Sequence, residues 1–167
     1  GHAALLVLEL GYEEMQRRGL TEATRDIADA VRRQCVFTTH TPVEAGHDRF
    51  SSELMSYAAH AFTVDLKVSH EELMDLGRVR AGDLSESFCM TVLALRYSRA
   101  ANGVSELHGL VSREMWQHFY GSKTVEEVPI GHVTNGVHLV GWMKGTVRRF
   151  WRAKYQQLHP QSERGVL

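Results

Sequence analysis

The sequence predicts an α/β protein, because segments with helical periodicity alternate with two short apolar runs. The runs are residues 35–39 (CVFTT) and 128–133 (VPIGHV), and each leads directly into a polar loop, as strands of a buried parallel sheet do. Hydrophobic residues make up 43% of the 167 residues, which is enough for the core of one domain. Two strands are few for a chain of this length, so we expect most of it to be helical.

Two helices are expected before the first strand. Apolar residues recur at helical spacing up to about Arg18, and Gly19 fits the end of that helix. Thr21 is the expected N-cap of a second helix. The apolar face of this second helix contains Ile27, Ala30 and Val31.

Two further helices are expected after the first strand. Residues 48–62 (DRFSSELMSYAAHAF) have the pattern of one continuous helix. Residues 69–79 (SHEELMDLGRV) predict a shorter helix, with Ser69 as its N-cap and Glu72 completing a capping box.

The region before the second strand has the clearest helical pattern. It covers residues 85–103, where Ser85 is a suitable N-cap and Asn102-Gly103 would end the helix. Residues 104–121 follow as another helix or a pair of helices.

The second strand is expected to end in a turn at residues 134–136 (TNG), followed by an amphipathic helix over 144–158. The apolar side chains of this last helix are expected to face the core: Val147, Phe150, Trp151, Tyr155 and Leu158. Its arginines could mark a nucleic-acid patch, but we favour a solvated helix face.

Composition excludes several classes of protein. The 19 basic residues nearly cancel the 20 acidic ones, so a net charge of −1 provides no field that attracts nucleic acid or an anionic membrane. No apolar stretch reaches the roughly 18 residues that span a bilayer. Cys35 and Cys89 both lie in apolar runs, which suits reduced thiols of a cytoplasmic protein better than a disulfide framework. The N-terminal stretch lacks the basic leader of a signal peptide.

The two polar loops after the strands are the best candidates for a binding site. They contain Thr38-Thr39-His40-Thr41 and Thr134-Asn135-Gly136, respectively. In open α/β sheets, ligands bind outside the carboxyl ends of the strands. Imidazole, amide and hydroxyl groups suit a sugar hydroxyl better than a phosphate or a hard metal ion. The alternative is that both loops are turns chosen only for their backbone conformation.

Other kinds of site have little support. His40 and His47 are seven residues apart, which does not place two imidazoles on one helix face, and no Cys-x-x-Cys pair exists. We therefore expect no metal site. Gly-x-Ser-x-Gly, a Walker loop and Gly-x-Gly-x-x-Gly are also missing, so neither an activated nucleophile nor a phosphate cradle is predicted.

Three segments, in this order, resemble the α-glucan phosphorylases, the glycogen, starch and maltodextrin phosphorylase family. They are residues 37–50 (FTTHTPVEAGHDRF), 90–116 (MTVLALRYSRAANGVSELHGLVSREMW) and 128–139 (VPIGHVTNGVHL). The resemblance covers nearly the whole chain and is strongest to the shorter bacterial and archaeal branch. Residues 1–4 (GHAA) are similar to the end of that branch's Asn-Glu-Gly-His motif, so we expect an internal fragment of the N-terminal half.

The resemblance implies a large enzyme of the GT-B glycosyltransferase type, with its active site between two Rossmann-like domains. Residues 1–167 would be a single, helix-rich segment of the N-terminal domain. Pyridoxal phosphate, held as a Schiff base by a lysine of the C-terminal domain, would lie outside this chain. Such an enzyme uses inorganic phosphate to release α-glucose 1-phosphate from the non-reducing end of an α-1,4-glucan or maltodextrin. The resemblance implies a cytoplasmic location and leaves open whether the parent is a homo-oligomer.

The resemblance also implies roles for individual residues. His40 matches the histidine that contacts glucose in the catalytic subsite, and Asn135 matches the asparagine that holds glucose hydroxyls. His2 matches a histidine near the catalytic site, with a less defined role. Asn102 and Gly103 match an Asn-Gly-Val motif that we interpret as a helix end. No residue matches the cofactor lysine or the cations that hold the substrate phosphate, so this chain alone is expected to be inactive.

The sequence departs from the family at residues 139–142 (LVGW), where the branch often has Pro and Thr before the tryptophan. Two other classes of protein remain open. A nucleotide-sugar glucosyltransferase of the glycogen synthase type shares the fold type, but more often has Asn-Gly-Ile/Val-Asp where this chain has residues 135–138 (NGVH). A non-catalytic carbohydrate-binding module is the other alternative.

Overall fold

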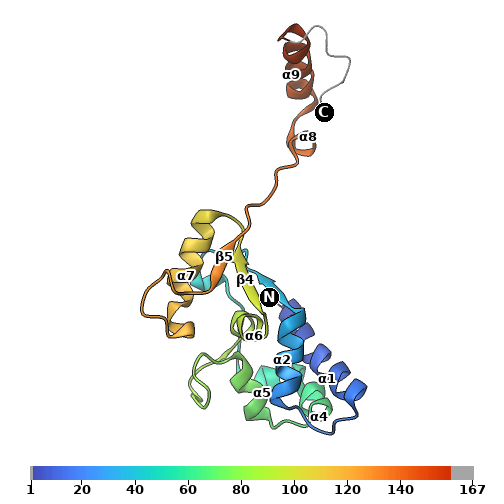
Figure 1. Ribbon diagram of the computed structural model, residues 1–167, viewed down its shortest axis with the longest axis vertical. Helices are drawn as coiled ribbons and strands as arrows, with labels where there is room; N and C mark the ends of the chain where they lie inside the picture. Colours follow the sequence, from blue (N-terminus) through green and yellow to red (C-terminus); the bar gives the residue numbers. More distant parts are fainter. Residues whose placement is uncertain (1, 159–167) are drawn as a thin grey trace. The chain divides into compact units, whose positions relative to one another are not determined.

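The structure is a computed structural model that describes residues 2–158, with the side chains of all but residues 139 and 140 (Figure 1). The chain divides into two units, Gly1–Thr134 and Asn135–Leu167. The helices of the first unit are η1 (His2–Leu5), α1 (Leu6–Arg18), α2 (Arg25–Gln34), η2 (Glu44–Gly46), α3 (Ser52–Ala58), α4 (His60–Asp65), α5 (His70–Gly77), α6 (Met90–Arg96) and α7 (Glu106–Tyr120). Its strands are β1 (Val36–Thr38), β2 (Arg49–Phe50), β3 (Phe88–Cys89), β4 (Ala100–Gly103) and β5 (Ile130–His132). The second unit contains α8 (Leu139–Trp142) and α9 (Gly145–Leu158).

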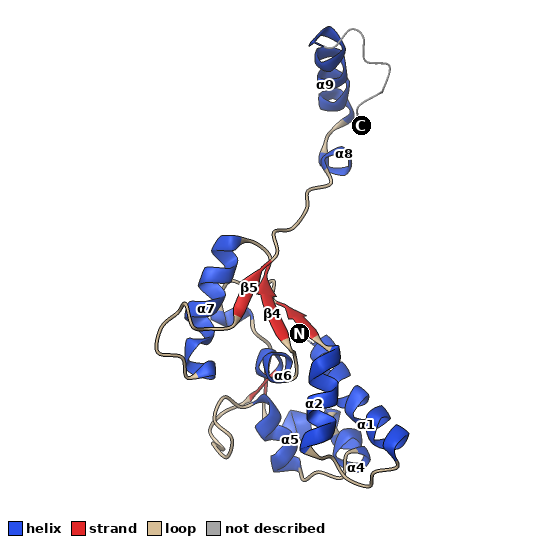
Figure 2. Ribbon diagram, viewed as in Figure 1, coloured by secondary structure: helices blue, strands red, loops and turns tan. Residues whose placement is uncertain are grey.

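A parallel sheet with the order β1-β4-β5 organises the first unit (Figure 2). Phe37 pairs with Ala101, and Ala101 with Ile130, so the three strands are in register at these positions. Helix α7 connects β4 to β5, as expected for a crossover between parallel strands. The prediction of an α/β fold with a parallel sheet is confirmed, as are the two predicted strands.

The predicted continuous helix over residues 85–103 is wrong. Only α6 is helical there, and it is flanked by β3 and β4. Strand β4 forms because the N–H of Arg99 donates to the carbonyl of Cys35 at 3.0 Å, next to β1. Ser85 is not an N-cap, since its backbone N–H and hydroxyl donate to the carboxylate of Asp83 at 3.0 and 2.6 Å. Asn102-Gly103 ends a strand, which corrects the interpretation of this motif as a helix end.

Two other helix boundaries differ from the prediction. Thr24, not Thr21, precedes the first residue of α2, and its side chain makes no capping hydrogen bond. The expected helix over 48–62 is divided into α3 and α4 at Ala59, and it begins only after β2. Strand β2 forms because Phe50 pairs with Phe88 in an antiparallel ribbon with β3.

The predicted C-terminal end of α1 and the predicted N-terminal cap of α5 are confirmed. Helix α1 ends at Arg18, followed by Gly19 in the left-handed conformation (φ 67°). The capping box of α5 is present: the side chain of Ser69 accepts from the N–H of Glu72 at 3.2 Å, and the Ser69 N–H donates to the Glu72 carboxylate at 2.7 Å. These signals are local, so no distant strand competes with them.

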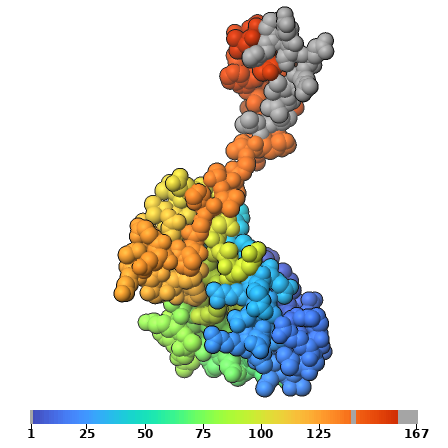
Figure 3. Space-filling model, viewed as in Figure 1, coloured from blue at the N-terminus to red at the C-terminus, as the bar shows by residue number. Residues whose placement is uncertain are grey.

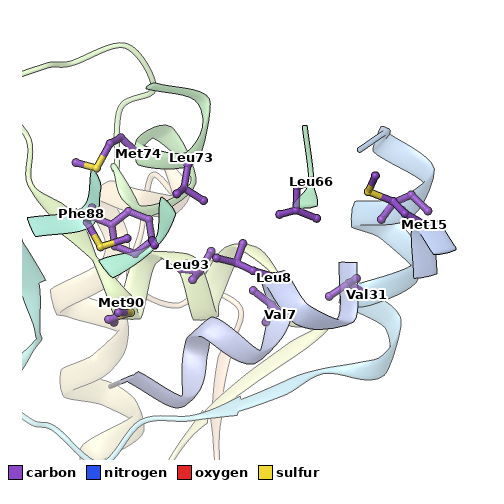
Figure 4. Packing of buried hydrophobic residues seen from close by; sticks show 13 residues of the cluster. Val7, Leu8, Met15, Val31, Leu66, Leu73, Met74, Phe88, Met90 and Leu93 are labelled. Atoms are coloured by element: carbon purple, nitrogen blue, oxygen red, sulfur yellow. The ribbon is translucent and has the colours of Figure 1, made fainter. Parts of the chain in front are cut away.

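Two groups of buried side chains form the core of the first unit. The larger one contains Val7, Leu8, Met15, Ile27, Val31, Met55, Ala59, Leu66, Leu73, Met74, Phe88, Met90 and Leu93 (Figure 4). Helices α1 and α2 pack against each other over it, and Figure 3 shows them side by side. The smaller one lies between the sheet, α6 and α7 and contains Cys89, Val92, Leu95, Ala101, Trp116, Val128 and Ile130. The predicted burial of Ile27, Ala30 and Val31 on α2 is confirmed.

The second unit confirms a predicted helix but not its burial. Helix α9 covers almost the expected range, yet none of its residues is buried. Phe150 and Trp151 are 56% and 58% exposed, and their rings meet edge to face at 5.6 Å. The expectation that the apolar face of α9 lies in a core is therefore wrong for this unit, whose elements are too few to cover a helix face. Within residues 2–158, no helix is long and apolar enough to cross a membrane.

Candidate functional site

The carboxyl ends of the three parallel strands define one edge of the sheet. Thr38 at the end of β1 pairs with Asn102 of β4, and Gly103 of β4 pairs with His132 at the end of β5. Because the strands are parallel and in register, the loops that follow them leave from this same edge. Strand β4 lies between β1 and β5, so the two loops predicted to form a site leave from strands that are not direct neighbours.

Asn102 connects two of these strand ends. Its carbonyl accepts from the N–H of Thr39 at 2.9 Å, which extends the pairing of β1 with β4 by one bond. Its side-chain oxygen accepts from the Thr38 hydroxyl at 3.1 Å, and its amide nitrogen donates to the carbonyl of Gly103 at 3.1 Å. The interpretation of this residue as part of a helix end did not predict these contacts. The signal that could have corrected this interpretation is Ser105, the N-cap of α7, which implies that the residues just before it are not helical.

The junction between β4 and α7 is unusually close. A Cβ on Gly103 would lie 2.8 Å from the backbone nitrogen of Gly109, so only glycine fits at this strand end. The Nδ1 atom of His108 accepts from the N–H of Val104 at 3.2 Å. In a neutral imidazole the proton must then be on Nε2. The first turn of α7 is therefore fixed against the carboxyl edge of the sheet.

A pocket of about 110 Å³ lies beside the end of β1. Its lining residues are Phe37, Thr38, Thr39, His40, Thr41, Gly46, His47, Asp48, Met90 and Thr91. Thr39 is 4% exposed, and its hydroxyl accepts from the N–H of Thr41 at 3.4 Å, which connects the residues on either side of His40. The side chain of His40 is exposed and makes no hydrogen bond to any residue that the structure describes. Its two ring nitrogens are available to a ligand.

His47 is the buried histidine of the same loop. Its Nδ1 atom lies 2.8 Å from the hydroxyl of Thr91 on α6, and its Nε2 atom lies 3.1 Å from the sulfur of Met115 on α7. Its ring meets Trp116 edge to face at a centroid distance of 5.0 Å. Burial, followed by the positive charge of Arg49, lowers the pKa of His47 below its usual value. The imidazole is consequently neutral at pH 7.

The other two predicted site residues are His2 and Asn135. His2 lies in η1, is exposed, and does not line the pocket. Asn135 is exposed and is the first residue of the second unit, so its proximity to His40 stays a prediction. Residues 133–138 form no regular element. No group of three His, Cys, Asp or Glu side chains that could hold a metal ion occurs in the described part of the chain.

The fold and the site define the class: an α/β protein with a polar pocket of hydroxyl and imidazole groups at the carboxyl edge of a parallel sheet. No protein-family model matches the chain. It is 39% identical to the maltodextrin phosphorylase of Thermococcus litoralis over 119 residues, which are 71% of this chain and 14% of that protein. It is 39% identical to the glycogen phosphorylase of Mycobacterium tuberculosis over 148 residues, or 85% of this chain and 17% of that protein. The glycogen phosphorylase of Aquifex aeolicus is 32% identical over 127 residues, or 74% of this chain.

The chain therefore belongs to the α-glucan phosphorylase family, as its three motifs predicted. It spans only 14 to 17% of the length of these curated relatives. It is also 30% identical over 117 residues to an uncharacterised protein of Methanocaldococcus jannaschii, covering 20% of that protein.

Proposed function

We propose that this chain is the part of an α-glucan phosphorylase that lines the glucose and glucan side of the active-site cleft. The parent enzyme would release α-glucose 1-phosphate from the non-reducing end of an α-1,4-glucan with inorganic phosphate. The single observation that carries the proposal is the pocket at the end of β1. There the loop of the first family motif places the exposed His40 beside residues of the second motif, Met90 and Thr91.

The chemistry of the pocket suits a neutral, hydroxyl-rich ligand. His40 offers one donor and one acceptor when its ring is neutral, and the nearby threonine hydroxyls offer both. A glucosyl group that develops oxocarbenium character needs its ring and hydroxyls held in place, so the role of these residues would be positioning. In this proposal His40 contacts the glucose in the catalytic subsite, Asn135 holds glucose hydroxyls, and His2 lies close by.

The pocket does not fit the cofactor of this family. Pyridoxal phosphate requires a lysine for its Schiff base, and the pocket is lined by neither lysine nor arginine. The proposal therefore assigns cofactor and substrate phosphate to another part of the polypeptide, in a GT-B arrangement with a second Rossmann-like domain. The isolated chain would be inactive. A cytoplasmic location belongs to the same proposal and is supported by the two free cysteines, Cys35 and Cys89.

The test is an assay of the full-length polypeptide that contains this chain, with pyridoxal phosphate bound. With maltoheptaose and inorganic phosphate, we expect formation of glucose 1-phosphate. A holoenzyme that forms none would refute the proposal. A parallel reaction with a nucleotide sugar and maltodextrin separates the glycogen synthase alternative, for which glucan elongation would be the product.

A binding titration tests the carbohydrate-binding alternative. The isolated chain is titrated with maltoheptaose, and we expect weak or no binding because the proposed site has residues on only one side of the sugar. Tight binding by the isolated chain, without turnover by the longer polypeptide, would favour a binding module.

A further inference from the structure

We propose that His47 is a positioning residue that holds the His40 loop, residues 39–48, against α6 and α7 so that the sugar pocket is formed before the ligand arrives. The inference deepens the proposed function and rests on it. His40 can contact a ligand only if the exposed loop that carries it has a defined position. Within the described residues, the anchors of this loop converge on His47 and its neighbours.

The loop is attached at both of its ends, to β4 at its start and to the first residue of α6 at its end. At the start, the N–H of Thr39 donates to the carbonyl of Asn102 at 2.9 Å. At the end, the carbonyl of Asp48 accepts from the N–H of Met90 at 3.1 Å, where α6 begins. Between these two bonds, the N–H of Gly46 donates to the carbonyl of Val43 and the N–H of His47 to that of Glu44, so these short-range bonds connect the loop only to itself. Backbone bonds alone therefore leave its middle part unattached to the core.

The side chain of His47 provides the missing attachment. It is 7% exposed and contacts two helices at once, through Thr91 on α6 and Met115 on α7. Thr91 is 6% exposed, so the bond between its hydroxyl and Nδ1 of His47 is shielded from water. A buried polar group left without its hydrogen-bond partner destabilises the fold, because its desolvation is no longer compensated. This bond therefore favours one position of His47 and of the loop that carries it.

Gly46, which directly precedes His47, connects it to the residues around His40 by packing against Thr41. A Cβ added to Gly46 would lie 2.5 Å from Cγ2 of Thr41, so the two sides of the loop are in direct contact at this point. Thr41 directly follows His40 and lines the pocket with it. Movement of His47 away from Thr91 would carry Gly46 away from Thr41 and open the pocket.

The environment also favours the neutral imidazole as the anchor. Nε2 faces a thioether sulfur, which is a weak acceptor, and the edge of Trp116 approaches the ring. The charged side chains that act on this ring are Arg49, which disfavours its protonation, and Glu44 and Asp48, which favour it. The nearby His108 acts in the same direction as Arg49. Burial is the largest effect and keeps the ring neutral.

Hydrogen–deuterium exchange on the full-length polypeptide tests the anchor without reference to activity. His47→Leu and Thr91→Val each remove the polar contact, and we expect peptides covering residues 39–48 to exchange at least about tenfold faster in both. Peptides from α2 should be unchanged. Thr91→Ser, which keeps the hydroxyl, should recover most of the protection lost in Thr91→Val. His60→Leu, at an exposed position on α4, is the matched histidine control.

Kinetics separate positioning from a general loss of structure. If the loop adopts its binding-competent conformation only part of the time, the apparent affinity for the substrate falls in proportion to the populated fraction. Turnover at saturating substrate is retained. We expect KM for maltoheptaose to rise about tenfold in both variants, with kcat within about twofold, and the double variant to be no worse than either single one.

Unchanged exchange at 39–48 in both His47→Leu and Thr91→Val would overturn the inference, as would additive effects in the double variant. An inactive wild-type holoenzyme would count against the proposed function instead. The exchange measurement would still decide whether His47 anchors the loop.

Discussion

His40 and His47 belong to one loop but have opposite environments. His40 is exposed and lacks a hydrogen bond to the described residues, whereas His47 is buried and contacts Thr91 and Met115. An exposed side chain without partners contributes little to folding, so any strong requirement for His40 must come from a ligand. This separation of roles leads to a prediction for His40.

His40→Ala should reduce kcat/KM for phosphorolysis by about 5- to 150-fold, the effect of losing about 1–3 kcal/mol of hydrogen bonding to the substrate. The melting temperature should change by less than about 2 °C, because no intramolecular contact is lost. The two quantities are measured on the full-length holoenzyme by initial rates and by calorimetry, with His60→Ala as the exposed histidine control. A large loss of melting temperature with normal activity per folded molecule would mean that His40 is only structural.

At the scale of residues, the sequence motif located the loop, but it did not predict which of the two histidines is buried. The motif placed His40 and His47 seven residues apart, and pattern reading could not tell which imidazole faces solvent. That difference depends on Thr91 and Met115, which are 44 and 68 residues away from His47. The contacts of Asn102 were not predicted for the same reason, since its side-chain contact with Thr38 spans 64 residues.

At the scale of elements, the predictions succeeded where signals are local. The ends of α1 and α5 depend on Gly19 and on the Ser69–Glu72 pair, which act within one helical turn. Strand β4 (AANG) has no strand propensity of its own, because Ala, Asn and Gly are all depleted in strands. It becomes a strand because its backbone pairs with β1 on one side and with β5 on the other, so tertiary structure overrides local preference.

The C-terminal turn of α1 provides a prediction about pH. Glu14 is mostly buried, and its carboxylate accepts from Arg17 at 2.6 and 2.9 Å and from Arg18 at 2.6 Å. The hydrogen bonds from Arg17, and then those from Arg18, lower the pKa of Glu14 from 4.5 to about 2, against the opposing effect of burial. A depressed pKa in the folded state means that the unfolded state takes up this proton first as the pH falls. The stability that Glu14 contributes is therefore complete above about pH 5 and is lost toward pH 2.

Glu14→Gln should lower the free energy of unfolding at pH 7, and the difference from wild type should shrink as the pH falls from 5 to 2.5. Urea unfolding followed by circular dichroism at pH 7, 5, 3.5 and 2.5 gives both curves. Glu13→Gln is the neighbouring control, because Glu13 is exposed and no hydrogen bond of its side chain is recorded. A difference that stays constant across this range would show that Glu14 contributes by packing and not by charge.

At the scale of the whole molecule, every buried hydrophobic side chain among the described residues lies in the first unit. All residues of both buried groups have numbers of 130 or lower, and none of the residues of α9 is buried. The sequence predicted the α/β class but also predicted burial for Phe150 and Trp151, because an amphipathic pattern does not specify what covers its apolar face. The family resemblance was recognisable from three motifs, while the strand order β1-β4-β5 depends on pairing between distant residues that periodicity does not contain.

Because the core ends at Ile130, residues 1–134 should fold without the second unit. We expect the free energy of unfolding of a 1–134 variant to stay within about 1 kcal/mol of that of the 167-residue chain, since deleting exposed residues removes no core contact. Urea unfolding can be followed by the fluorescence of Trp116, which is buried in the smaller core group and is the sole tryptophan of the 1–134 sequence. A matched truncation at Gly121 also removes Val128 and strand β5 with its Ile130, and with these two side chains about 3–6 kcal/mol of burial. This shorter variant should lose its cooperative transition, whereas loss of cooperativity already in 1–134 would mean that the second unit is part of the folding core.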